Sequence, residues 1–281
     1  MPSIEGIPHL ELVRPDRIRF HENPEGSRTA RLVARLREEG RLRNPPIVAR
    51  LDETEYVLLD GANRVSALRD IGYSHLPVQV IDYERESVQL KGWHHLLVEG
   101  AKLNLREAYA GIDGVRLQEV READLPGLLE LRRVYAALVD VSGTPWALFP
   151  ESGRVLLPEW MSVITQAVAA YEGRTRLERI KVADYAELPE VFHTVDHQLA
   201  LYPTITKVDL LRLVSDGITI PTGLTRHLIA GRALGLNLDL AFLTELETDE
   251  QKKDHLRRFV DDLEMRGRIR FYEESAFIMN E

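Results

Sequence analysis

The sequence YVLLDGANRVSALRDIG, residues 56–72, passes from a β-forming run through Asp60 and Gly61 directly into a helical pattern that stops at Gly72. A carboxylate at a strand end, a glycine that allows close backbone approach, and free N–H groups at a helix start together make a place for an anion. Arg64, in the first turn, can add a charge-assisted bond to a phosphate. The alternative is that Asp60 caps the helix, Gly61 serves the turn and Arg64 is a solvated surface charge.

The elements on both sides of this junction predict a small domain. Apolar residues at near-helical spacing predict a helix from Ser27 to Glu39, with Ser27 as its N-cap and Gly40 as its stop. PPIVARL and YVLLD, separated by the polar turn 52–55, predict a hairpin, and LPVQVIDY predicts a further strand. With a first strand in LELVRP, the order β, α, β, β, α, β within about ninety residues predicts a compact α+β domain with a mixed sheet.

The rest of the chain gives a less regular pattern. Helical spacing predicts further helices in four segments, which are 87–101, 159–173, 207–217 and 248–267. We therefore expect an α+β protein of two domains, the first at 1–115. The second domain, at 116–281, is expected to be a largely helical α+β domain that completes a cleft and binds substrate.

The composition excludes several classes of protein. The chain has 281 residues, 44% of them hydrophobic, so it can bury a core, and it contains no Cys, which excludes a disulfide framework, a thiol nucleophile and Cys-ligated zinc. A net charge of -9 disfavours non-specific binding to nucleic acid, without excluding a local basic patch. No stretch has the pattern of a signal peptide or a membrane span, so we expect a cytoplasmic protein without a membrane partner. The composition does not indicate an oligomeric state.

The segment from about residue 16 to residue 85, which contains the junction, resembles the ParB/sulfiredoxin fold, so we expect the first domain, 1–115, to be ParB/sulfiredoxin-like. The matching stretches are RFHENPEGSRTARLVARLREEGRLRNPPIV and YVLLDGANRVSALRDIGYSHLPVQVIDYE. Within that fold the chain is most similar to the free L-serine kinases. The resemblance reappears at Trp93 and His94 and in IPTGLTRHLIAGRALGLN, residues 220–237.

Two other branches of this fold match less well. Sulfiredoxins carry a Cys in the turn that corresponds to 61–64, so a chain without Cys cannot have that activity. ParB proteins carry Gly-Glu-Arg-Arg at this turn and follow it with a helix-turn-helix domain, whereas this chain shows neither feature and is acidic. A ParB-like nucleotide- or DNA-binding regulator without small-molecule turnover stays open as the alternative.

The serine kinases show Asp-Gly-His-His-Arg at the turn and a His-Glu pair before the first helix. The chain keeps most of these positions, namely His21, Glu22, Asp60, Gly61 and Arg64. It departs from the pattern at Ala62 and Asn63, which stand where the kinases have two histidines. Phosphate contacts at these two positions are therefore expected from backbone N–H groups and not from imidazole rings.

The resemblance implies a role for each residue that matches. Glu22 corresponds to the glutamate proposed as general base toward the serine hydroxyl. Asp60 corresponds to the aspartate near the transferred phosphoryl group, where it would hold Mg²⁺ or orient the hydroxyl. The nucleotide phosphates would be cradled by the turn, which consists of Gly61, Ala62, Asn63 and Arg64.

The resemblance also implies residues that bind the amino acid. Trp93 and His94 resemble a pair that lines the amino-acid pocket, although the same two residues would also suit an ordinary helix face. Thr225, Arg226 and His227 offer a hydroxyl, a guanidinium and an imidazole to a carboxylate, or else Arg226 makes a structural salt bridge. The implied reaction is phosphoryl transfer, with Mg²⁺, from ADP or ATP to the hydroxyl of free L-serine or a similar hydroxy-amino acid. The sequence does not distinguish ADP from ATP.

Overall fold

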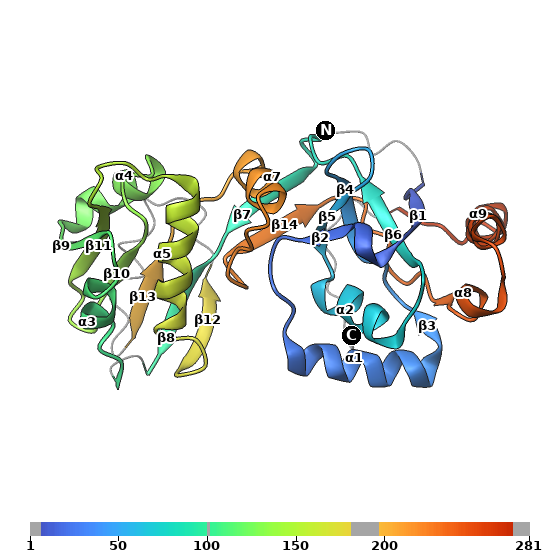
Figure 1. Cartoon of the computed structure of the whole chain (residues 1–281), viewed down its shortest axis with the longest axis horizontal. Helices are drawn as coiled ribbons and strands as arrows, with labels where there is room; N and C mark the ends of the chain where they lie inside the picture. The colour runs from blue at the N-terminus through green and yellow to red at the C-terminus, as the bar shows by residue number, and fades with distance from the viewer. Residues whose placement is uncertain (1–6, 100–101, 181–196, 272–281) are drawn as a thin grey trace. The chain divides into compact units, whose positions relative to one another are not determined.

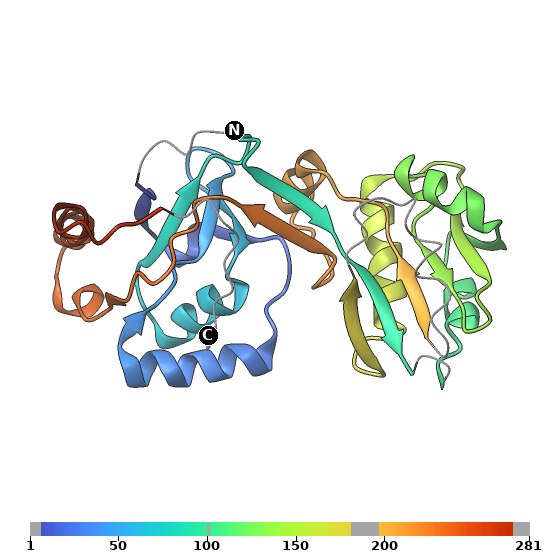
Figure 2. The same cartoon turned by 180° about the vertical axis from the view of Figure 1, so that it is seen from behind.

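The protein divides into two compact units, each with its own sheet (Figure 1, and from behind in Figure 2). The structure is a computed structural model and describes residues 7–99, 102–180 and 197–271. The first unit comprises the chain up to residue 19, 24–88 and the chain from 229 onward, and the second unit comprises 20–23 and 89–228. The boundary expected near residue 115 lies inside the second unit, because β8 (His94–Val98) already belongs to that unit's sheet.

The first unit is built on a five-stranded sheet with the order β1-β6-β4-β5-β2. The strands are β1 Leu10–Val13, β2 Ile18–Phe20, β4 Ile47–Arg50, β5 Tyr56–Asp60 and β6 Leu76–Ile81. β4 pairs antiparallel with β5 and parallel with β6, so the predicted hairpin and the predicted mixed sheet are both confirmed. Val48, Val57 and Val78 are fully buried in this sheet and form part of its core.

Two helices pack against each other in the first unit, α1 (Gly26–Glu39) and α2 (Ala62–Ile71). Gly40 ends α1 in the left-handed conformation, and its N–H donates to the Leu36 carbonyl at 2.9 Å, as expected for a glycine stop. The prediction that Ser27 is the N-cap is wrong, because Glu25 occupies that position. The Ser27 hydroxyl instead donates to the Glu25 carboxylate at 3.1 Å.

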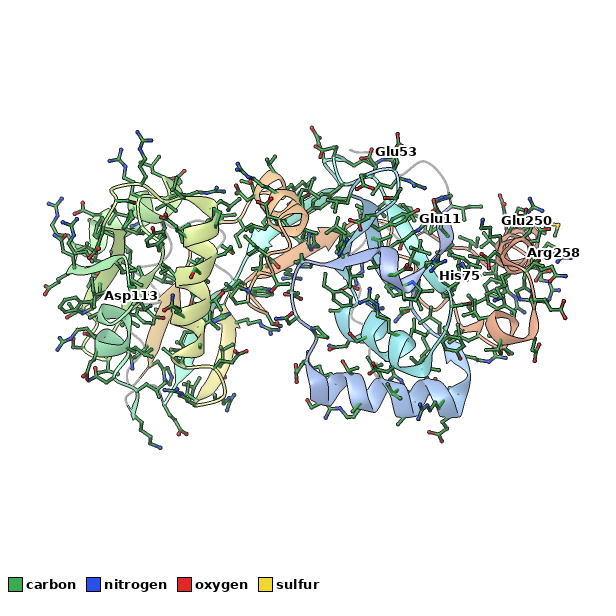
Figure 3. All side chains as sticks on the ribbon, in the orientation of Figure 1. Glu11, Glu53, His75, Asp113, Glu250 and Arg258 are labelled. Atoms are coloured by element: carbon green, nitrogen blue, oxygen red, sulfur yellow. The ribbon has the colours of Figure 1, made fainter. Side chains whose placement is uncertain are left out.

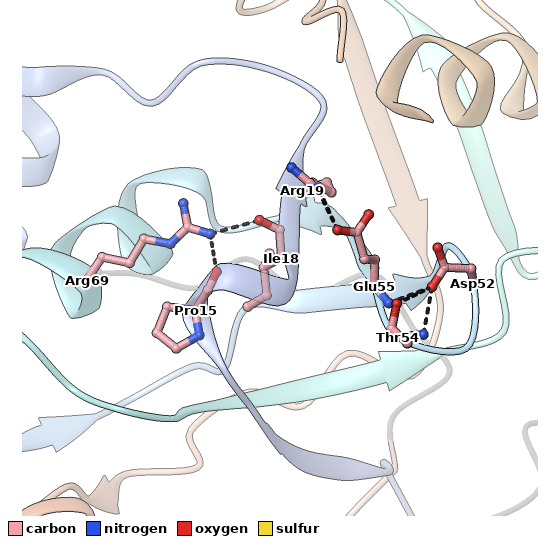
Figure 4. A network of polar contacts seen from close by, with 7 residues as sticks. All are labelled: Pro15, Ile18, Arg19, Asp52, Thr54, Glu55 and Arg69. Atoms are coloured by element: carbon pink, nitrogen blue, oxygen red, sulfur yellow. Dashed lines mark hydrogen bonds and ion pairs between the residues drawn. The ribbon is translucent and has the colours of Figure 1, made fainter. Parts of the chain in front are cut away.

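A network of polar contacts attaches the 3-10 turn η1 (Pro15–Arg17) and β2 to the rest of the first unit (Figure 4). Arg69, in α2, donates to the carbonyl oxygens of Pro15 and Ile18, the second at 2.8 Å. Arg19 Nε donates to Glu55 Oε1 at 2.9 Å. These bonds connect the edge strand β2 to α2 and to the turn that precedes β5, and so fix the start of the unit.

The end of the chain completes the first unit. β15 (Leu238–Asp239) pairs antiparallel with β3 (Arg41–Leu42), and α8 (Phe242–Glu245) and α9 (Asp249–Met265) follow it, with α9 contacting β1. The ring of His75, labelled in Figure 3, places Nε2 3.5 Å from Asp249 Oδ2 at the start of α9. The helix predicted at 248–267 is therefore confirmed, and it belongs to the first unit.

The second unit is built on a six-stranded antiparallel sheet with the order β12-β8-β13-β10-β11-β9. Besides β8, its strands are β9 Val115–Glu119, β10 Ala137–Val139, β11 Pro145–Pro150, β12 Arg176–Ile180 and β13 Gln198–Leu201. Its helices are α3 Leu105–Ala110, α4 Leu125–Glu130, α5 Leu157–Ala169 and α7 Lys207–Ser215. The helices predicted at 159–173 and 207–217 are confirmed. In the described ranges, no helix is both long and apolar enough to cross a membrane.

The helix predicted at 87–101 is wrong. The described part of this segment forms two strands, β7 (Val88–Gly92) and β8. β7 pairs with β14 (Thr225–Ile229), as Figure 2 shows, and β8 lies between β12 and β13. A central strand buries both of its faces and therefore lacks clear alternation, so its apolar run resembles that of a buried helix.

Candidate functional site

The junction of β5 and α2 in the first unit has the form of an anion site. Gly61 is the N-cap residue of α2 and has a φ of 97°, and no side chain in the described part of the chain caps this helix start. The first N–H to bond within the helix is that of Val65, which donates to the Gly61 carbonyl at 2.9 Å. The preceding N–H groups, of Ala62, Asn63 and Arg64, have no partner within the helix and can bind a phosphate.

Two arginines share the carboxylate of Asp60. Arg64 and Arg232 both donate to Asp60 Oδ2, Arg232 at 2.5 Å, and Arg64 also donates to the Asn44 carbonyl at 3.2 Å. Asp60 therefore holds two cations beside the start of α2, where guanidinium groups favour a phosphate. Arg232 is a residue that the sequence analysis did not predict. The available signal was its position in the matching stretch 220–237.

The side chain of Asn63 connects α2 to α1. Its Oδ1 accepts bonds from the Glu25 N–H at 2.7 Å and from the Thr29 hydroxyl at 3.2 Å. Asn63 therefore fixes the first turn of α1, and its backbone N–H is the group that remains for a phosphate. Asn63, which stands where the kinases have a histidine, therefore has a structural role in this protein.

A glycine at position 61 is favoured by its positive φ and by the closeness of the Arg64 side chain, and this gives a testable prediction. A Cβ at Gly61 would lie 2.9 Å from Arg64 Nε, whereas a Cβ at Gly72, which has nearly the same φ (96°), would have no atom within 4 Å. We expect Gly61→Ala and Gly72→Ala each to lower the free energy of unfolding by about 1 to 2 kcal/mol, measured by urea denaturation.

Only Gly61→Ala should also weaken binding of ATP, one of the two nucleotides expected from the sequence, because only there must the Arg64 guanidinium shift away from Asp60. Gly72→Ala is the matched control, since it carries the same backbone strain without the contact. Equal ATP affinity of the two variants in calorimetry would contradict a phosphate site at this turn.

Glu22 lies in the second unit, where its carboxylate is bound by a loop. Glu22 forms an isolated parallel bridge with Ile220, whose N–H donates to the His21 carbonyl at 2.7 Å. The Gly223 N–H donates to Glu22 Oε2 at 3.3 Å, and the Thr222 hydroxyl donates to the carbonyl of the residue after Glu22 at 2.9 Å. The loop before β14 thus orients the carboxylate expected to act as a base.

Strand alternation separates the three residues predicted to bind the substrate carboxylate. Thr225 Oγ1 lies 3.2 Å from His21 Nε2, and the ring of His227 meets the His21 ring edge-on, with 5.2 Å between centroids. Arg226 instead places its guanidinium carbon 5.0 Å from the centre of the Trp93 ring. The structure therefore groups Thr225 with His227 and groups Arg226 with Trp93.

His94 and His95 are both buried in the core of the second unit. His94 Nδ1 accepts a bond from the Tyr202 N–H at 3.2 Å, and burial lowers the pKa of His94 to about 4. This position suits a core residue, and the predicted contact of His94 with the amino acid stays a prediction. His95, which our sequence reasoning did not select, bonds to the Gly223 carbonyl at 3.0 Å and therefore contacts the loop that binds Glu22.

A metal ion has a possible ligand in Asp60. Within the described residues, no group of three His, Cys, Asp or Glu side chains could hold a metal ion. A magnesium ion bound to a nucleotide needs only one or two protein carboxylates, because phosphates and waters complete its coordination. Both arginines bind Asp60 Oδ2, so Oδ1 takes part in neither bond and fits such a role.

The predicted site residues are divided between the two units. The turn 61–64 and Asp60 belong to the first unit. Glu22, Trp93 and the stretch 225–227 belong to the second. The expectation that the second domain completes a cleft stays a prediction.

The chain is similar to serine kinases along nearly its whole length, although no family model matches it. It is 27% identical over 275 residues to the ATP-dependent L-serine kinase SbnI of Staphylococcus aureus. The aligned residues cover 97% of this chain and 98% of SbnI. The solved structure of C-terminally truncated SbnI from S. aureus matches with a TM-score of 0.72 and 24% identity, over 92% of this chain and 97% of that chain. A mutant free serine kinase in complex with ADP matches with a TM-score of 0.67 and 20% identity, over 86% of this chain and 98% of that chain. These likenesses confirm the α+β fold class and the resemblance expected from the sequence.

Proposed function

We propose that this protein is a kinase that transfers a phosphoryl group from ATP to the hydroxyl of free L-serine and so produces O-phosphoserine. The observation that carries the proposal is the similarity to an ATP-dependent L-serine kinase over 97% of the chain. The residues that match the kinases support it, since Glu22, Asp60, Gly61 and Arg64 are all retained. The name of that relative favours ATP over ADP as the donor.

The phosphates of ATP are bound at the start of α2. Backbone N–H groups of 62–64 donate to phosphate oxygens, and the Arg64 and Arg232 guanidinium groups neutralise their charge. Asp60 keeps the two arginines in place through Oδ2 and offers Oδ1 to Mg²⁺. Mg²⁺ held at this carboxylate would supply positive charge that offsets the negative charge developing on the leaving group.

The serine hydroxyl is activated by Glu22. A hydroxyl attacks phosphorus poorly unless a positioned carboxylate accepts its proton as the new O–P bond forms and the bond to the leaving ADP breaks. The Gly223 N–H, at 3.3 Å from Oε2, orients the Glu22 carboxylate for this step. Glu22 carries the proton at the end of the transfer and releases it to solvent.

The amino acid is bound in the second unit by a cationic side chain and by side chains that form hydrogen bonds. Arg226, which stacks on Trp93, is the residue that pairs with the serine carboxylate. Thr225 and His227, grouped around His21, offer hydrogen bonds to the remaining polar atoms of serine. Recognition through both a carboxylate and a hydroxyl favours a small hydroxy-amino acid over a simple alcohol.

The test is to incubate the purified protein with L-serine, Mg²⁺ and either ATP or ADP, and to follow the products by ³¹P NMR and mass spectrometry. We expect O-phosphoserine together with ADP in the ATP reaction, and less product or none with ADP as donor. D-serine, L-threonine and ethanolamine serve as comparison substrates. The proposal fails if neither donor gives phosphoserine, and DNA binding by such an inactive protein would support the ParB-like alternative.

A further inference from the structure

A chain of hydrogen bonds runs from Glu22 into the core of the second unit. The Gly223 N–H donates to Glu22 Oε2 at 3.3 Å, and His95 Nε2 lies 3.0 Å from the Gly223 carbonyl oxygen. His95 Nδ1 lies 2.7 Å from the Tyr171 hydroxyl, which lies 2.5 Å from the Tyr202 hydroxyl. All five residues belong to the second unit, and His95, Tyr171 and Tyr202 are buried.

The chemistry of the partners fixes the direction of each bond. A carbonyl oxygen only accepts, so His95 Nε2 carries a proton and donates to Gly223. Burial lowers the pKa of His95 to about 4, so at neutral pH the ring is uncharged and Nδ1 is an acceptor. Tyr171 therefore donates to Nδ1 and accepts from Tyr202. The tyrosine pair thus holds His95 in the tautomer that binds the loop.

The same bonds hold Gly223 on both sides of its Cα atom. Its N–H binds Glu22 and its carbonyl binds His95, and its φ of 87° places it in the left-handed region that glycine favours. A Cβ at Gly223 would meet the guanidinium of Arg179, which would have to shift to admit a side chain. Because the Gly223 carbonyl is bound to a buried ring, any rotation of the loop that moves this carbonyl together with the N–H would break a buried hydrogen bond.

We propose that His95, oriented by Tyr171, is a positioning residue that holds the Gly223 N–H against the carboxylate of Glu22. His95 is buried in the core, and in this proposal it acts on the reaction through the loop. The kinetic consequences of this inference rest on the proposed function, in which Glu22 is the base. That His95 fixes the position of Gly223 can be tested separately, by hydrogen exchange at the Gly223 amide.

The kinetic test compares His95→Asn with His95→Gln. The amide nitrogen of glutamine lies the same number of bonds from Cβ as Nε2 and can still donate to Gly223, whereas that of asparagine corresponds to Nδ1 and cannot reach it. We expect His95→Asn to lower kcat by about tenfold or more, with KM for serine and for ATP changed less than about twofold. His95→Gln should recover kcat to within about threefold of wild type. A loss of kcat that is equal in both variants would overturn the proposal.

The structural test is hydrogen exchange at the Gly223 amide, measured by NMR on the full chain without substrates. We expect protection to fall about tenfold in His95→Asn and to be retained in His95→Gln, because only the second keeps the bond to the Gly223 carbonyl. Tyr171→Phe, which removes the donor to Nδ1, should change the ¹⁵N shifts of the His95 ring. Equal protection in all variants would overturn the inference, whether or not the protein proves to be a serine kinase. A wild-type protein without phosphoserine formation would refute the proposed function alone.

Discussion

Glu22→Gln is expected to lower kcat by about 100-fold or more while the affinities for serine and ATP change little. Glutamine keeps the size of the side chain and one acceptor for the Gly223 N–H, but it cannot take the proton of the serine hydroxyl. Turnover is measured as phosphoserine formed, and ATP affinity is measured by calorimetry on the same preparation. Both quantities are needed, because a loss of binding would also lower the rate at a fixed substrate concentration.

Glu53→Gln is the matched control for this substitution. Glu53 is exposed in the turn between β4 and β5, is labelled in Figure 3, and should keep wild-type turnover when changed. If Glu22 made only a surface contact, its replacement would cost at most about 1 kcal/mol of stability and leave activity intact. Full activity of Glu22→Gln would therefore remove Glu22 as the base, even if the protein phosphorylates serine.

Arg64→Ala is expected to weaken ATP binding by about 1.5 to 3 kcal/mol, which is a factor of about 10 to 150 in Kd. The substitution removes a charge-assisted bond to phosphate and leaves Asp60 with Arg232 as its arginine partner at this site. Calorimetric titration with ATP and Mg²⁺ measures the effect. Arg232→Ala should weaken binding in the same direction, since both guanidinium groups are held by one carboxylate.

Arg258→Ala controls for the loss of one positive charge from the same unit. Arg258 is exposed on α9, is labelled in Figure 3, and donates within its own helix to the Asp254 carbonyl at 3.3 Å. Its removal should leave the Kd for ATP unchanged. If Arg64→Ala also left the Kd unchanged, Arg64 would be only a structural partner of Asp60.

The sequence predicted best those elements that are determined locally. α1 and α2 have helical apolar spacing and glycine stops, and the β4–β5 hairpin has a short polar turn, so each can be recognised from its own residues. β8 cannot, because its partners β12 and β13 lie about 80 to 100 residues away in the sequence. Only pairing over that distance shows that the segment is a strand and that the second unit is based on a sheet.

The candidate site divides in the same way between local and distant contacts. The turn at Gly61 was visible in one short stretch, whereas the bond between Glu22 and Gly223 joins residues 201 positions apart. Arg232 and His95 were missed although they lie in or beside the stretches that carry the resemblance, because residue type alone does not distinguish a functional arginine or histidine from an ordinary one. Their significance comes from partners supplied by other segments of the fold, namely Asp60 and Gly223.

The interruption of the first unit by the second sets an order for folding during synthesis. A ribosome makes the strands of the six-stranded sheet, the last of which ends at Leu201, before it makes anything beyond residue 228. Until that final segment emerges, β3 lacks β15 and Asp60 lacks Arg232. The turn 61–64, although encoded early in the chain, therefore acquires its second arginine only at the end of translation.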